Sequence, residues 1–480
     1  MNFVQGGTMN VKRWTLAVVS AATAMLMLDI AVVNTALPRI AEDLDTGLGG
    51  LQWVVDSYTL ALASTVLTAG ALADRLGRRR VFAVGLVVFT VASLACALAG
   101  SIEVLNSARA VQGLGGAILF AVSLSLLANA YPDQRERAGA LAVYGATIAG
   151  SFAVGPLVGG ALTSAFDWQW VFLINIPIGL VCLWITLRCV EESRDPAARR
   201  IDWGGLVTLT GGLSLLVLAL LRGNEDGWTS LPIVAELSGA ALLLGAFLTI
   251  ESRVREPMLP LGLFRDRAFS GAQIGAFAIS GSFFAVFIYA TLYLQQILGL
   301  SPVEAGLVYV PSTIVMLVVS GATADLSEKV GPGVLVSAGL ALVAVGMAMI
   351  TVADVDSSWA VMLPGLVVGM IGTGLFNPAV IAVALAGVPD EQSGLAAGVN
   401  DTFRQAGIAV GVAGLGALVP AGAAFGDGSP ADYVAGLHDA LWVGAGLAAA
   451  GAVAAALLIA RRGPAAAVEA PAQVEPVRAG

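Results

Sequence analysis

The chain has 480 residues, of which 58% are hydrophobic and only 12% are charged, and its formal net charge is −9. A typical soluble domain is about 45–50% apolar and about 25% charged. This composition, with a mean hydropathy of +0.86, excludes a single soluble core and predicts an all-α integral membrane protein whose apolar surface is solvated by lipid.

In chain order, apolar stretches of about 20 residues predict fourteen transmembrane spans. The expected spans are residues 15–37, 51–73, 81–100, 104–128, 138–163, 169–189, 203–222, 232–251, 269–296, 304–325, 332–352, 359–386, 394–419 and 437–460. They group into an N-terminal six-helix bundle at 1–190, two additional central helices with linkers at 191–260, and a C-terminal six-helix bundle at 261–462. The Ala- and Pro-rich residues 463–480 are expected to form a disordered tail.

The basic residues alternate between the predicted connections. Almost all Lys and Arg residues lie in every second connection and near the termini, whereas the other connections contain only Arg39 and Arg222. Basic connections tend to stay on the cytoplasmic side of a membrane. We therefore expect a multi-pass protein of a bacterial cytoplasmic membrane, with both termini in the cytoplasm and residues 223–231 outside.

The residue types that build metal and nucleotide sites are sparse. The three cysteines have no C-x-x-C spacing, and His438 is the only histidine, so no disulfide framework, metal site or cofactor is expected. Neither Lys12 nor Lys329 follows a Gly-rich loop, which excludes an ATP-driven pump on this chain. The same sparseness argues against a membrane enzyme. No nucleic-acid partner is expected.

A weak internal repeat links the two predicted bundles. Residues Gly70–Arg75 read GALADR and residues Gly321–Leu326 read GATADL, and each copy closes the second span of a six-span set. Two related halves around a site near the membrane midplane are typical of secondary transporters. The repeat therefore favours a transporter.

The segment GALADRLGRRR at residues 70–80 resembles the signature loop between the second and third spans of the major facilitator superfamily. The resemblance implies the major facilitator fold and a conformational role for this loop. The alternative is an ordinary basic cytoplasmic loop, which the spacing and the partial repeat disfavour. The implied motif residues are Gly70, Asp74, Arg75, Gly77 and Arg78.

Three further segments resemble the fourteen-span drug:proton antiporters of this superfamily. Residues 28–38 (LDIAVVNTALP) are similar to their first-span motif, residues 109–113 (RAVQG) to their buried-arginine motif, and residues 150–160 (GSFAVGPLVGG) to a span-five motif of exporters. Glycines there allow close helix contact, and proline bends the span. The resemblance implies conformational roles for Gly155, Pro156 and Gly159.

Weaker similarity extends over nearly the whole chain, at residues 170–177, 293–295 and 400–405. One departure is Gln169, where the family usually has an arginine. This departure puts in doubt a charged contact at the outer end of the sixth span.

Ionisable residues inside spans cost roughly 2.5–3.5 kcal/mol each on insertion scales, so they suggest function. Asp29 and Asp401 are predicted proton carriers, and Arg109 is predicted to hold a nearby carboxylate in its ionised form. The alternatives are structural partners for Asp29 and Arg109. For Asp401 the alternative is a neutralised pair with Arg404, three residues further along, to which the resemblance also gives a conformational role.

Asp56 in the second span is predicted to recognise cations, because an acid here resembles the exporters of quaternary ammonium compounds. The alternative is an interfacial carboxylate near the outer surface. The tenth span has no acid, unlike that of some dication exporters, which puts efficient dication export in doubt. The other expected substrate-binding residues, whose aromatic members could equally be packing residues, are Asn34, Tyr58, Gln112, Tyr289, Phe376 and Asn377.

Together these features predict a monomeric proton-coupled antiporter that exports lipophilic, mainly cationic, drugs or antibiotics by alternating access. Its partners would be the substrates, protons and the lipid bilayer, and its driving force the proton gradient. Two alternatives stay open: an exporter of one endogenous metabolite, and a proton-coupled nutrient symporter on the same fold. The exporter-type segment around Gly155 and Pro156 favours export over the symporter.

Overall fold

The computed structural model describes residues 2–194, 202–386, 388, 393–420, 422–423 and 428–459. Over these residues the chain consists of helices and short connections and contains no β-strand. The prediction of an all-α protein is therefore confirmed. The tail expected to be disordered, residues 463–480, lies outside the described residues.

The N-terminal half consists of α1 (Asn2–Asp43), α2 (Leu48–Leu76), α3 (Arg78–Ala97), α4 (Ile102–Ala130), α5 (Gln134–Ala165), α6 (Trp170–Leu173) and α7 (Asn175–Cys189). The two additional helices are α8 (Trp203–Asp226) and α9 (Leu231–Glu251). The C-terminal half begins with η1 (Leu261–Arg265) and a continuous span made of α10 (Arg267–Ile279), η2 (Ser280–Phe284), α11 (Ala285–Leu292) and η3 (Tyr293–Ile297). It continues with α12 (Pro302–Val330), α13 (Pro332–Ile350), η4 (Trp359–Val361), α14 (Leu363–Leu385), α15 (Ser393–Gly416) and α16 (Pro430–Leu458).

Twelve of the described helices are long and apolar enough to cross a membrane, and α5 is a thirteenth if its two bent parts form one span. The parts Gly139–Ile148 and Ala153–Ala165 meet at 42°. Pro156 accounts for the bend because it has no N–H for the carbonyl four residues earlier, which lies within the break.

The predicted thirteenth span, residues 394–419, corresponds to α15, which is not among these spans. Its 24 residues would extend about 36 Å at 1.5 Å per residue, which exceeds the hydrocarbon core of a bilayer. It is less apolar than the other long helices because it carries Asn400, Asp401, Arg404 and Gln405. The count of fourteen therefore stays a prediction.

The helices of each half pack mainly on one another. In the N-terminal half α1 packs on α5 and α7, and α4 packs on α2 and α3; in the C-terminal half α14 packs on α12 and α13, and α16 on α10 and α13. The halves meet along two lines, where α2 packs on α15 and where α5 packs on α12. We call these contacts the α2–α15 seam and the α5–α12 seam.

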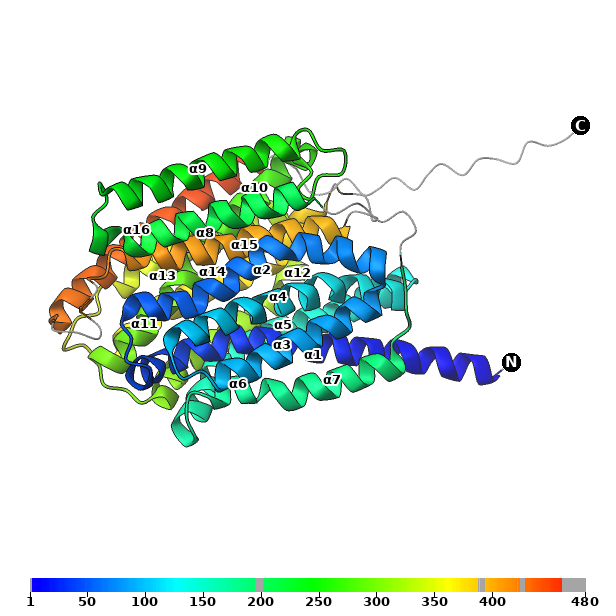
Figure 1. Cartoon of the computed structure of the whole chain (residues 1–480), viewed down its shortest axis with the longest axis horizontal. Helices are drawn as coiled ribbons and strands as arrows, with labels where there is room; N and C mark the ends of the chain where they lie inside the picture. Colours follow the sequence, from blue (N-terminus) through cyan, green and yellow to red (C-terminus); the bar gives the residue numbers. More distant parts are fainter. Residues whose placement is uncertain are drawn as a thin grey trace, which may run out of the picture.

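The two additional helices lie on one side of the molecule, with α9 at the outer edge (Figure 1). α8 packs on α9 and also on both α2 and α15, so it lies over the α2–α15 seam. Only 17% of the apolar stretch of α9 is buried, against 89% for the span that starts with α10. The remaining surface of α9 therefore suits contact with lipid, whereas the α10 span is enclosed by protein.

Both copies of the internal repeat end a helix in the same way. α2 is followed by Gly77 and α12 by Gly331, with φ of 112° and 86°, and the next helix starts at the following residue. Residues other than glycine rarely adopt these φ angles, which explains glycine at both helix ends. The repeat thus corresponds to two similar turns, one in each half.

Glycines of α5 bring three helices into close contact. A Cβ atom at Gly155 would clash with Ala31 of α1, and one at Gly160 would clash with the carbonyl oxygen of Pro302 in α12. Gly306 of α12 is equally close to the carbonyl of Pro156. Close approach of this kind is how small residues stabilise helix pairs in membranes.

The close packing of α5 predicts opposite changes in stability for alanine substitutions at two of its glycines. Gly160→Ala should lower the apparent Tm in detergent, because overpacking a tight contact costs roughly 1–3 kcal/mol. Gly145→Ala is the matched control: its Cβ would meet nothing within 4 Å, and alanine is favoured over glycine in a helix by roughly 0.5–1 kcal/mol. Equal Tm shifts for the two variants would contradict the packing described here.

Candidate functional site

Asp29 of α1 is completely buried and accepts hydrogen bonds from three side chains. Arg109 Nη1 of α4 lies 2.6 Å from Asp29 Oδ2, while Gln112 Nε2 and Asn175 Nδ2 each lie 2.8 Å from Oδ1. These donors and the guanidinium replace the water that the buried carboxyl group loses. The structure thus brings together Asp29 and Arg109, the expected coupling residues, and places beside them Gln112, which was expected to bind substrate.

Arg109 is held from several sides. Its Nε donates to the carbonyl of Val54 at 3.0 Å, and its Nη1 also donates to Gln112 Oε1 at 2.6 Å. The guanidinium carbon lies 4.3 Å from the centre of the Tyr58 ring and 5.8 Å from that of Phe172. These are cation–π distances, so the charge is balanced by a carboxylate, a carbonyl and two rings.

Two members of this network, Ser93 and Asn175, were not predicted. Ser93 Oγ accepts from Gln112 Nε2 at 2.9 Å, and Asn175 contacts both Ser93 and Asp29. Asn175 lies in residues 170–177, one of the segments similar to the antiporters, which was a usable signal. Ser93 is one serine in an apolar span, and nothing in the sequence distinguishes it.

Asp56 of α2 is also fully buried, but neither carboxylate oxygen has a hydrogen-bond partner. One turn earlier, Gln52 Nε2 donates to the Tyr289 hydroxyl at 2.8 Å and approaches the carbonyl of Val412 in α15 at 3.4 Å. Because residues four apart share a helix face, Asp56 faces the C-terminal half. It is enclosed by protein and is not a surface carboxylate.

Asp401 and Arg404 of α15 do not form an ion pair among the residues that the structure describes. Asp401 is 5% exposed, and its Oδ2 has no partner. The neighbouring Asn400 instead donates to Gln273 of α10 at 3.0 Å inside the C-terminal half. The two side chains therefore make no direct ion pair, but Arg404 still acts on Asp401 electrostatically, so the alternative of a neutralised pair stays open.

The other expected substrate-binding residues lie in different places. Tyr58 is buried beneath Arg109 in the N-terminal half, and Tyr289 lies between α2 and α15. Phe376 packs on Gly275 and Gly339 inside the C-terminal half, and Asn377 beside it is partly buried, with its Oδ1 unpaired. Only Asn34 lines the cavity between the two halves.

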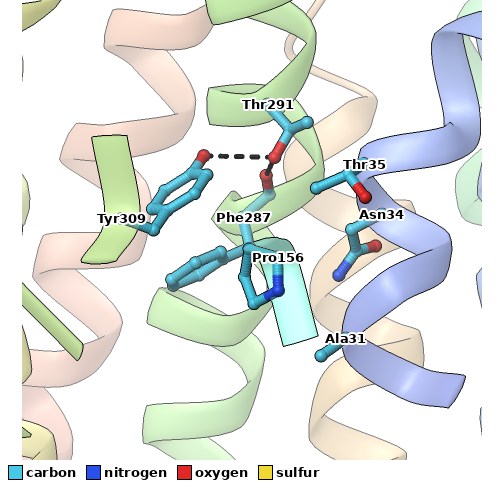
Figure 2. Close-up of a pocket in the computed structure, with 7 residues that line it drawn as sticks. All are labelled: Ala31, Asn34, Thr35, Pro156, Phe287, Thr291 and Tyr309. Carbon is cyan, nitrogen blue, oxygen red and sulfur yellow. Dashed lines mark hydrogen bonds between the residues drawn. The ribbon is translucent and has the colours of Figure 1, made fainter. Parts of the chain in front are cut away.

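That cavity has room for about one water molecule. Figure 2 shows its walls, which come from both halves. They are formed by Ala31, Asn34 and Thr35 of α1, Pro156 of α5, Phe287 and Thr291 of α11, and Tyr309 of α12. Thr291 Oγ1 donates to the carbonyl of Phe287 at 2.8 Å and lies 3.1 Å from the Tyr309 hydroxyl.

Between this cavity and the end that carries the α1–α2 connection, neutral contacts hold the halves together. Gln52 and Tyr289 connect α2, α11 and α15, and Gln295 Nε2 donates to the carbonyl of Thr35 at 3.0 Å. The glycine contacts of α5 with α12 lie on the same side. This end of the bundle is therefore closed.

At the opposite end, the α2–α3 turn binds the segment that follows α7. Arg78 pairs with Asp74 at 2.9 Å, and its backbone N–H donates to the carbonyl of Ser193 at 2.9 Å. Glu192 accepts from the backbone N–H of Arg79 at 3.1 Å and pairs with Arg80 at 3.5 Å. The first amides of α3 are thus capped by another part of the chain, whereas Arg75 is exposed and Gly70 is half-buried.

At the outer end of the sixth span, where Gln169 put a charged contact in doubt, two neutral side chains contact Asp43. Trp168 Nε1 donates to Asp43 Oδ2 at 2.8 Å, and Gln169 Nε2 lies 3.5 Å from the same oxygen.

Among the described residues, no three His, Cys, Asp or Glu side chains come together as a metal site would require.

Residues 19–412 match the family model of the Major Facilitator Superfamily. The multidrug resistance protein Stp of Mycobacterium tuberculosis is 36% identical over 85% of this chain and 76% of its own length. The methylenomycin A resistance protein of Streptomyces coelicolor is 36% identical over 84% and 85%. The cephamycin export protein CmcT of Amycolatopsis lactamdurans is 35% identical over 91% and 90%.

Solved structures share the fold at low sequence identity. The human organic anion transporter MFSD10 superposes with a TM-score of 0.64 at 16% identity, covering 92% of this chain and 99% of that one. A peptide transporter, POT, gives a TM-score of 0.66 at 14% identity, covering 92% and 95%. The predicted fold is therefore confirmed.

The buried pair generates a prediction about stability. Arg109→Met should lower the free energy of unfolding by roughly 3–5 kcal/mol, because Asp29 would stay buried without its counter-charge. The double variant Asp29→Leu/Arg109→Met should lose less than the sum of the two single variants. Apparent Tm values in detergent measure both effects.

The control for this double-mutant cycle of Asp29 and Arg109 is Arg39→Met. Arg39 pairs with Glu42 at the surface, where its side chain is 55% exposed, so its loss should cost less than about 1 kcal/mol. An Arg109→Met protein as stable as the Arg39→Met protein would refute the structural role of the buried pair.

Proposed function

The chain belongs to the Major Facilitator Superfamily, and on this premise we propose that it is a proton-coupled antiporter that exports drugs or antibiotics across the bacterial cytoplasmic membrane. The observation that carries the proposal is the set of relatives named for drug resistance or antibiotic export, which are 35–36% identical over most of both chains. The resemblance of residues 150–160 to the span-five motif of exporters supports the direction of transport.

Asp29 and Arg109 are the proposed coupling pair. A proton that binds Asp29 cancels the charge that holds Arg109, and a buried guanidinium without its partner is costly. The network must then rearrange, which links proton binding to conformation. Asp401 is the proposed second carrier: it is buried with a free oxygen on α15, the helix that packs on α2 of the other half.

Energetics favour two protons for each exported monovalent cation. Expelling such a cation against about 100 mV and a hundredfold gradient costs about 5 kcal/mol. One proton entering down the same potential and about one pH unit supplies about 3.7 kcal/mol, which is insufficient, whereas two supply about 7.4 kcal/mol. Asp29 and Asp401 match this need for two titratable groups.

Asp56 is the proposed point of attraction for cationic cargo. An acid near a cation gains Coulomb energy in a medium of low dielectric constant, whereas neutral cargo gains none. Its position on the face of α2 that packs against the C-terminal half means that separation of the halves would uncover it.

Export of one endogenous metabolite is the second candidate. A specific observation favours it: the relative that aligns over 91% of this chain is named an export protein for cephamycin. An efflux and resistance panel in an efflux-deficient bacterial host separates the two candidates, because a dedicated exporter would protect against one compound class only. Counterflow measurements in the same host exclude or support a nutrient symporter.

The proposed orientation places both termini in the cytoplasm and residues 223–231 outside. We expect a reporter that is active only in the periplasm to be inactive after Arg462 and active when inserted at Gly227, the turn between α8 and α9. Periplasmic activity after Arg462 would reverse the assignment and, with it, the side of the membrane from which each proton is taken.

Voltage dependence tests the coupling. In reconstituted vesicles without a pH gradient, export of a monovalent cation should respond to an imposed voltage, because exchange of two protons for one cation moves net charge. One-for-one exchange is electroneutral, so voltage-insensitive export would rule out the two-proton claim.

The same vesicles test the carriers. Asp29→Asn should abolish proton-driven export and keep some substrate binding, and Asp401→Asn should lower the proton number. Full activity of Asp29→Asn would remove its assigned role. Asp45→Asn, in the short connection after α1, is the control for loss of one acid and should export normally.

A further inference from the structure

The walls of the cavity in Figure 2 come from both halves of the protein. α1 and α5 supply one side, and α11 and α12 supply the other. Relative movement of the halves must therefore change its width and its access. In the present conformation it is nearly closed, and separation of the halves would widen it.

The cavity offers flat apolar surfaces. The rings of Phe287 and Tyr309 lie 4.9 Å apart at an angle of 30°, and Phe283 packs edge-on against Phe287 at 5.6 Å. Pro156 lines the same space (Figure 2). A planar ring gains both apolar burial and ring–ring contact in such surroundings.

The cavity also offers hydrogen-bonding groups that can be redirected. Thr291 has one hydroxyl proton and directs it to the carbonyl of Phe287, so the Tyr309 hydroxyl must be the donor in its contact with Thr291. A ligand acceptor can take over that donor. The Asn34 amide lines the same space, and the described part of the chain supplies no hydrogen-bond partner for it.

Among the residues that the structure describes, no charged side chain lines the cavity. Asp29, two residues before Ala31, directs its carboxylate to Arg109, Gln112 and Asn175 inside the N-terminal half. Asp56 and Asp401 lie on α2 and α15, at the other seam. A cation in this cavity would lose its hydration without gaining a counter-charge. An uncharged ligand avoids this free-energy cost of desolvation.

We propose that this cavity recognises uncharged, flat aromatic compounds that carry a hydrogen-bond acceptor, and that such compounds are substrates in their own right beside cations. The inference rests on the proposed export function and narrows its substrate class. A site that is mostly apolar, with a few convergent polar groups, is the usual form of a small-molecule pocket.

Two dyes test the proposal: Nile red, which is flat, uncharged and carries a carbonyl acceptor, and ethidium, a permanent cation. Proteoliposomes with an imposed proton gradient should export Nile red. Asp56→Asn should weaken ethidium export more than Nile red export, because the described lining of the cavity contains no acid. Ethidium export without Nile red export would overturn the inference and leave the export function standing, whereas export of neither dye would count against the export function itself.

Binding of Nile red to the purified protein, followed by fluorescence, locates the site. Tyr309→Phe removes one hydroxyl and should raise Kd about five-fold, and Phe287→Leu about three- to ten-fold. The matched controls are Tyr433→Phe and Phe82→Leu, both buried residues outside the cavity, and they should leave Kd unchanged. Equal effects of cavity variants and controls would overturn the proposal; if Phe287→Leu does not fold, Tyr309→Phe, which keeps its ring, still decides.

Discussion

The packing of the N-terminal half depends on the buried contact between Asp29 and Arg109. Burial of a charge is tolerated only when a counter-charge and hydrogen bonds replace water. Here the replacement comes from Gln112 and Asn175, with the carbonyl of Val54 completing the shell of Arg109. One charge pair therefore fixes helices from across the N-terminal half relative to one another and makes that half a rigid unit.

The contacts between the halves are of a different kind. Among the described residues they include hydrogen bonds from Gln52 and Gln295 and the close approach of Gly160 to Pro302, with no ion pair joining one half to the other. A neutral hydrogen bond contributes only about 0.5–1.5 kcal/mol net. The contact that would cost most free energy to break, the charged one, therefore lies inside one half. The contacts between the halves are neutral and cost less to break, which suits alternating access.

Some of this was predictable from sequence. Apolar length predicted the membrane-spanning helices, of which the structure describes twelve or thirteen, and the repeated Gly–Ala–x–Ala–Asp pattern favoured two related halves. A lone arginine in an apolar span required an acid nearby, as Arg109 and Asp29 show. The partners Ser93 and Gln52, and the packing of Phe376 inside the C-terminal half, were not predictable. They depend on the rotation of each helix about its axis, and a helix that is apolar all round carries no periodic signal of which face is inward. Glu192 was missed for a related reason, because it acts across a connection whose path the sequence does not fix.

The position of α8 divides the membrane-facing surface of the protein into two unequal sides. Because α8 packs on both α2 and α15, it covers that seam, whereas neither α8 nor α9 makes a comparable contact with α5 or α12. A lipophilic molecule dissolved in the membrane therefore meets different surfaces on the two flanks. On one flank the additional helices cover the junction between the halves, and on the other the halves meet directly through the proline-bent α5 and α12.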